Sequence, residues 1–131
     1  MTAKSKAAQP SICEQGGPEN QVTGIRVRVA DVVTFAAWIC GTATRMHVVL
    51  QDAAGVEQKL IDQEGLTKGS ATLPRLAPGL YILLWSFTQV SSPWQTRTEV
   101  AVNDTNRFLH RKSSTDNNPF LRGFLSVEVV P

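Results

Sequence analysis

The chain has 131 residues, and 13 lysines and arginines against 11 acidic residues give it a net charge of +2. This length suits one domain, and so small a charge argues against a nucleic-acid binder, which would carry a basic stripe. Hydrophobic residues make up 42% of the sequence, and no apolar run approaches the roughly 20 residues of a membrane span. We therefore expect a soluble globular domain that neither binds nucleic acid nor crosses a membrane.

The first 20 residues combine Lys, Gln, Gly and Pro and show no apolar stretch. A secretory signal needs about 7–15 apolar residues after its charges, but Ala7 and Ala8 are followed at once by Gln9 and Pro10. We predict a flexible arm over residues 1–20 and a single domain over residues 21–131. The protein is then cytoplasmic, or exported without a cleaved signal peptide.

Two cysteines are present, Cys13 in the arm and Cys40 in an apolar run. Two free thiols in a reducing cytosol are the favoured interpretation, and a disulfide that pins the arm to the body is the alternative. Neither cysteine has a CxxC or metal-ligand spacing, so we expect no zinc, no other metal and no cofactor.

Apolar and polar residues alternate with period two in many short segments, and Gly, Pro, Asn and Asp bound these segments. The expected strands cover residues 25–29, 32–40, 45–51, 56–60, 69–76, 80–90, 95–102, 107–112 and 125–129, with a polar loop over residues 113–119. Eight or nine short strands at regular spacing predict an all-β antiparallel sandwich of jelly-roll or immunoglobulin-like kind.

The segment LAPGLY, from Leu76 to Tyr81, resembles the Pro-Gly-x-Tyr entry to a late strand in many β-sandwich modules. Carbohydrate-binding and cell-surface modules are among them. The resemblance covers six residues and identifies no family, and it implies the sandwich fold alone.

Two expected strands, residues 32–40 and 80–90, are apolar on both faces. A two-layer sandwich buries one face of each sheet, so such strands need a second cover: the arm, a long loop or another subunit. Their large side chains predict a homo-oligomer with an interface built from Trp38, Tyr81, Trp85 and Phe87. The alternative is that loops of the same chain cover both strands.

Connections between successive antiparallel strands alternate between the two ends of a sandwich. The longer connections, residues 41–44, 62–68, 91–94 and 113–119, fall at one end. Since binding residues lie disproportionately on loops held by a rigid scaffold, we place the site at this end.

Trp94 follows a strand terminator and is expected near a loop tip at that end. An aromatic ring beside amides and a carboxylate is the usual chemistry of a sugar site. The predicted ligand-binding residues are therefore Trp94, Gln95, Arg97, Asp116, Asn117 and Asn118. The alternative is that Trp94 anchors its loop over the edge of the sandwich.

No set of Ser or Cys, His and carboxylate marks a catalytic relay, and no known catalytic motif is present, so we expect no enzyme and no catalytic residues. The favoured function is a lectin-like recognition module with a glycan as its ligand. The alternative is a structural protein, an assembly subunit of a homo-oligomer or larger complex without a small-molecule site.

Overall fold

A computed structural model describes residues 12–15, 17–20, 22–41, 45–90, 94–114 and 118–131. One 3-10 helix, η1 (Ile12–Glu14), precedes the strands. The nine strands are β1 (Gly24–Arg28), β2 (Val33–Cys40), β3 (Arg45–Asp52), β4 (Glu57–Glu64), β5 (Lys68–Thr72), β6 (Gly79–Val90), β7 (Trp94–Val102), β8 (Thr105–Ser114) and β9 (Asn118–Val130).

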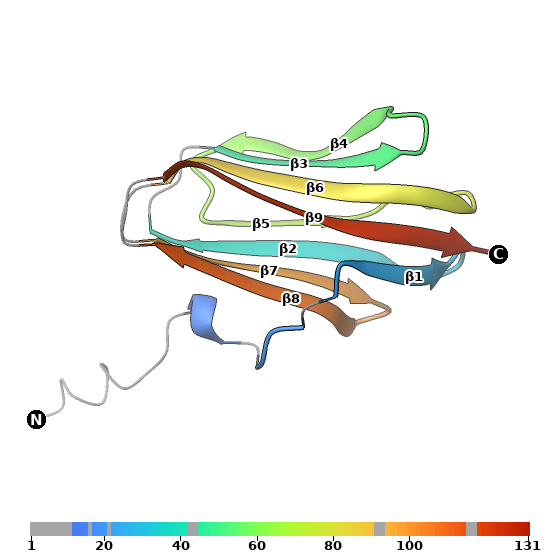
Figure 1. Cartoon of the computed structure of the whole chain (residues 1–131), viewed down its shortest axis with the longest axis horizontal. Coiled ribbons are helices and arrows are strands. Elements are labelled where there is room, and N and C mark those ends of the chain that lie inside the picture. Colours follow the sequence, from blue (N-terminus) through green and yellow to red (C-terminus); the bar gives the residue numbers. More distant parts are fainter. Residues whose placement is uncertain (1–11, 16, 21, 42–44, 91–93, 115–117) are drawn as a thin grey trace, which may run out of the picture.

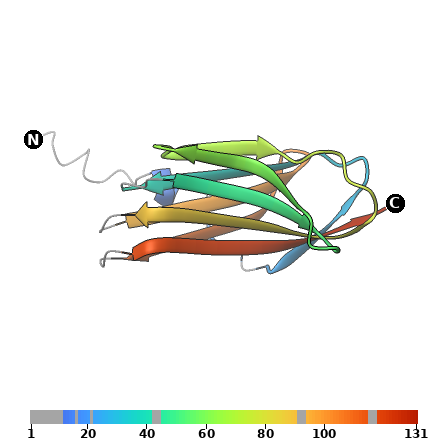
Figure 2. The ribbon, with the colours of Figure 1, turned by 90° about the horizontal axis from the view of Figure 1, so that it is seen from above.

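The strands form two sheets that pack face to face, as Figures 1 and 2 show from two directions. The five-stranded sheet has the order β1-β9-β6-β3-β4, and the four-stranded sheet has the order β5-β2-β7-β8. Every pairing is antiparallel except that of β1 with β9, which is parallel. The predicted β-sandwich of nine strands is thus confirmed.

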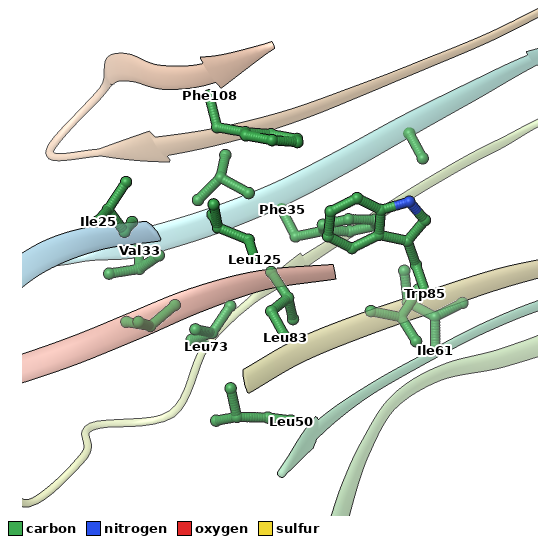
Figure 3. Packing of buried hydrophobic residues seen from close by; sticks show 14 of the residues in the cluster. Ile25, Val33, Phe35, Leu50, Ile61, Leu73, Leu83, Trp85, Phe108 and Leu125 are labelled. Carbon is green, nitrogen blue, oxygen red and sulfur yellow. The ribbon is translucent and has the colours of Figure 1, made fainter. Parts of the chain in front are cut away.

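The core lies between the sheets and follows from the alternation of each strand. In β2, Val33, Phe35, Ala37 and Ile39 are buried while their neighbours are half-buried. The largest rings of the core meet in one chain of contacts, because Phe35 lies 5.6 Å from Trp85 and Trp85 lies 5.6 Å from Phe108. Figure 3 shows these rings between the strands of the two layers.

The connections alternate between the two ends as expected, but their lengths do not follow the prediction. At the end expected to hold only short turns, residues 73–78 between β5 and β6 span six residues, whereas residues 65–67 between β4 and β5 at the other end span three. The pairs Cys40–Gln95, Val90–Asn118 and Trp94–Ser114 bring the ends of β2, β6 and β8 to the starts of β7 and β9. These ends lie together at the left of Figure 1, whereas the short β3–β4 and β7–β8 turns lie at the opposite end.

Three strands extend well beyond the bounds predicted from the sequence. β4 continues to Glu64 rather than ending at Leu60. β8 runs ten residues and forms an edge of its sheet, and β9 begins at Asn118 rather than near Leu125. Pro119 and Gly123, which disfavour strands, concealed the first part of β9 in the sequence. Its inward row of Leu121, Gly123 and Leu125 nevertheless keeps the period of two.

The described part of the arm is docked rather than free, so the flexible arm predicted over residues 1–20 does not hold for residues 12–15 and 17–20. Residues 1–11 of that prediction lie outside the described residues. Cys13 forms a disulfide with Cys40 and is almost completely buried. Farther along, the backbone N–H of Asn20 donates to the carbonyl of Leu109 on β8 over 2.9 Å. The interpretation of the cysteines as free thiols is therefore wrong, and the alternative of a pinned arm is correct.

The described part of the chain contains no helix with the length and apolar character that a membrane crossing requires.

Candidate functional site

The sequence placed Trp94 near an exposed loop tip, and this is wrong. Trp94 is the first residue of β7, its side chain is only 3% exposed, and it belongs to the hydrophobic core. It alternates inward with Thr96 and Thr98, so the strand directs its ring between the sheets. The alternative given above, a ring that anchors the loop end over the sandwich, matches this position.

The other predicted ligand residues do not join Trp94. Gln95 and Arg97 alternate with it and lie on the outward face of the four-stranded sheet. Asp116 and Asn117 fall outside the described residues, and for Asn118 only the backbone at the start of β9 is described. Since the sheet separates the Trp94 ring from Gln95 and Arg97, these three side chains cannot line one pocket.

The predicted interface residues are also distributed differently. Trp85 and Phe87 face the core at 6% and 2% exposure, so they do not lie at a surface between subunits. Tyr81 packs partly against the core and its hydroxyl donates to the carbonyl of Ala77 over 2.8 Å. The inward face of β6 is the one with the aromatic residues, and the face with Leu80, Ile82 and Leu84 points outward.

Trp38, the fourth of these residues, lies on the outward face of the four-stranded sheet. The guanidinium of Arg97 stacks on its ring at 3.9 Å, and the Lys68 ammonium lies 5.6 Å from the same ring. Arg97 also forms an ion pair with Glu99, Nε to Oε2, at 2.6 Å. The arm completes this cover, because Arg97 Nη1 donates to the carbonyl of Ile12.

Arg111 on β8 holds the rest of the docked arm. Its Nε donates to the carbonyl of Cys13 over 3.0 Å. Its Nη2 donates to the carbonyls of Glu14, Gln15 and Gly17. One guanidinium fork therefore binds four backbone carbonyls between Cys13 and Gly17.

A cleft of about 250 Å³ opens on the side of the sandwich where β8 faces β9. β1 pairs with β9 only from Ser126 to Val130, so the first part of β9 is an open edge. β8 is the edge of the other sheet, and Phe108, His110 and Lys112 point from it toward the facing layer. The cleft lies between these two edges, and Val22 and Thr23 line it from the segment before β1.

Aromatic side chains form the floor and walls of this cleft. Trp85 and Phe108 lie deepest, and the His110 ring lies 5.7 Å from the Phe108 ring. Phe124, which is 57% exposed, stands at the mouth. Gly123 makes room for this arrangement, because a Cβ built there would clash with the indole of Trp85.

Two cations stand at the cleft, Lys112 from β8 and Arg122 from β9. Lys112 Nζ donates to the Arg122 carbonyl over 2.8 Å and so bridges the two sheets. An ammonium has three donors, so this bond leaves two for other acceptors. No carboxylate is among the described residues that line the cleft.

A smaller hollow of about 10 Å³ adjoins the cleft between Trp85, His110 and Lys112. Its volume matches about one water molecule, and Thr96 and Thr98 line it. Polar groups thus reach the base of the aromatic cleft, where they can hydrogen-bond a ligand directly or through water.

Sequence reasoning missed Arg122 and Phe124 because it ended the polar loop at residue 119 and began the next strand at Leu125. The signal was the alternation of Leu121, Gly123 and Leu125 with Arg122 and Phe124 between them. A glycine at an inward position concealed it.

No protein-family model matches the chain, and no curated protein sequence matches it. Among the described residues, no group of three or more His, Cys, Asp or Glu side chains is placed to hold a metal ion.

Proposed function

We propose that the protein is a non-enzymatic recognition module and that it binds an acidic saccharide in the cleft between β8 and β9. The observation that carries the proposal is the composition of the cleft. Four aromatic rings and two cations line it, and the described residues that line it include no carboxylate.

Each part of a uronic acid, or of a similar anionic sugar, matches a part of the cleft. Phe124 and His110 offer ring faces near the mouth, and a pyranose presents its C–H face to such rings. Lys112 and Arg122 can donate charge-assisted hydrogen bonds to a sugar carboxylate or sulfate. Thr23 and His110 lie where they can hydrogen-bond hydroxyl groups.

The size of the cleft supports a short ligand. Small-molecule sites usually enclose roughly 300–1,000 Å³, and this cleft of about 250 Å³ falls just below that range. It therefore suits one sugar unit, with the rest of a chain extending over the edge of β9. Single sites of this kind bind weakly, so repeated copies would gain avidity.

The disulfide bears on the compartment. Disulfides persist in oxidising environments and are rare in the reducing cytosol, and the Cys13–Cys40 bond fixes the arm to the domain. We therefore favour the exported form of the two locations expected from the sequence, where glycans with acidic groups are also displayed.

A glycan array tests the proposal, with neutral, uronic-acid, sialylated and sulfated probes. We expect acidic probes to bind and neutral ones to fail. Lys112→Met and Arg122→Gln should each weaken binding about 10- to 100-fold, since a hydrogen bond to a charged group contributes roughly 1.5–3 kcal/mol. Binding should also fall with rising salt.

Arg75→Gln is the matched control. Arg75 is exposed in the segment between β5 and β6 and does not line the cleft, and the substitution removes the same charge. It should bind as the wild type does. Equal binding of neutral and acidic probes, or loss of binding in the control, would refute an acidic-sugar site in this cleft.

A further inference from the structure

The outward face of the five-stranded sheet carries an apolar stripe. Leu80 is 64% exposed and Ile82 37% exposed on β6, and Leu84 continues the row. Phe124 on β9 pairs with Leu84, and Val49 on β3 pairs with it from the other side. The stripe is therefore continuous over three neighbouring strands.

The strand registers order this face into rows that cross the sheet. One row runs from Arg122 on β9 through Ser86 and His47 to Asp62 on β4. The row of Ser126, Ile82 and Gln51 ends at Glu57 on β4. Arg26 on β1 belongs to the neighbouring row, where it pairs with Glu128.

Charge differs between the two ends of these rows. The β1 and β9 side presents Arg26, Arg28 and Arg122 against Glu128, a net of +2. The β3 and β4 side presents two basic and three acidic side chains, a net of −1, from Arg45, Lys59, Glu57, Asp62 and Glu64. When a second copy is related to the first by a two-fold axis parallel to β6, the basic β1 and β9 side of each copy lies over the acidic β3 and β4 side of the other.

The area of the face is sufficient. Five strands about 4.8 Å apart span roughly 24 Å, and nine residues of β6 at about 3.4 Å each span roughly 30 Å. The footprint of roughly 700 Å² approaches the roughly 800 Å² per partner of a stable protein interface. Exposed apolar surface of this kind marks interaction sites.

We propose that a second copy of the chain covers this face, with the two β6 strands crossing near a two-fold axis that runs along them. Aligned sheets pack at about −30°, which brings the Leu80 and Ile82 rows of the two copies into contact. Arg26 of each copy then lies within reach of Glu57 of its partner. This interface is isologous, so it closes as a dimer.

Sedimentation velocity across the micromolar range tests the dimer. We expect the wild type to sediment as a dimer, and Leu80→Lys and Ile82→Lys to raise the dissociation constant at least tenfold. Neither residue lines the cleft, but Phe124 and Arg122 belong to both surfaces. Glycan binding is therefore measured on the Leu80→Lys variant, in which no partner copy covers them. Val32→Lys is the control, since Val32 is equally exposed but lies outside this face.

The axis is tested by charge exchange. Arg26→Glu should weaken the dimer, and adding Glu57→Arg should restore it. A monomeric wild type, or a dimer that Ile82→Lys leaves intact, would overturn the interface. If the double variant dimerises no more tightly than Arg26→Glu alone, the proposed axis is overturned.

Discussion

The outward face of the four-stranded sheet is covered by the chain's own N-terminal segment, whereas the outward face of the five-stranded sheet has no cover among the described residues. The first face holds Trp38 beneath Arg97 and the disulfide-bound arm. The second exposes Leu80, Ile82 and Phe124. Both faces belong to strands that are apolar on two sides, so the same sequence signal has two structural outcomes.

The difference shows what an irregular segment needs in order to cover a sheet. A single turn of 3-10 helix buries little apolar surface, and ordering each residue costs about 1–2 kcal/mol of backbone entropy. The arm therefore depends on covalent and charged attachments, the Cys13–Cys40 bond and the Arg111 fork. A second folded copy needs no such attachment, because its surface is already ordered.

Removing the disulfide that holds the arm over the four-stranded sheet should cause the largest loss of stability. The bond closes a loop of 27 residues, and the chain-entropy relation assigns such a loop about 3–4 kcal/mol of stability. The double variant Cys13→Ser, Cys40→Ser should lose about that amount in urea unfolding, and the reduced wild type should match it. Stability within about 1 kcal/mol of the oxidised protein would show that the arm is not held this way.

Truncating the ring under the arm should have the next largest effect. Trp38→Ala removes a half-buried indole and the platform on which Arg97 stacks, and we expect a loss of about 2 kcal/mol. Leu80→Ala on the open face should change the stability of the dilute protein by less than about 0.5 kcal/mol. Equal losses in thermal or urea unfolding would contradict the distinction between the two faces.

Replacing Arg111 should loosen the arm without unfolding the domain. Arg111→Lys keeps the charge and removes the fork that binds four carbonyls, so we expect a loss of about 1–2 kcal/mol. Hydrogen exchange should quicken at residues 17–20. Arg107→Lys, on the same strand, is the control and should leave exchange unchanged.

Acid should lower the stability of the folded protein by the smallest amount, through Asp62 on the outward face of the five-stranded sheet. Arg45 hydrogen-bonds the Asp62 carboxylate, and with His47 and Lys59 it holds the pKa of Asp62 below its ordinary value. A lowered pKa in the folded state adds stability above the unfolded pKa of about 3.9, and this stability is lost as the pH falls through the folded pKa. Asp62→Asn should flatten the acid limb of a pH series of urea unfolding curves, and an unchanged limb would contradict this.

The fold and the alternation of connections between the two ends followed from the sequence because both depend on local patterns. Period-two alternation located β1, β3 and β7, and turn residues such as Asp52 and Gly55 separated the strands.

The location of the site did not follow, since it depends on which face of each strand points inward. β6 is apolar on both faces, and its neighbours, rather than its own sequence, direct Trp85 inward. Likewise Trp94 follows a proline at a strand start, a position that suits both an exposed tip and a buried anchor. Lys112 and Arg122 meet only because β8 and β9 are edges of opposite sheets.

The parallel pairing of β1 with β9 has a consequence for how the chain acquires its structure during synthesis. Arg26 and Glu128, which form an ion pair at 2.9 Å, are 102 positions apart. β1 leaves the ribosome long before β9 and has no strand partner until β9 follows. Contacts of such long range are slow to form, so β1 should be the last strand to join its sheet, and shortening the C-terminus should release it as well.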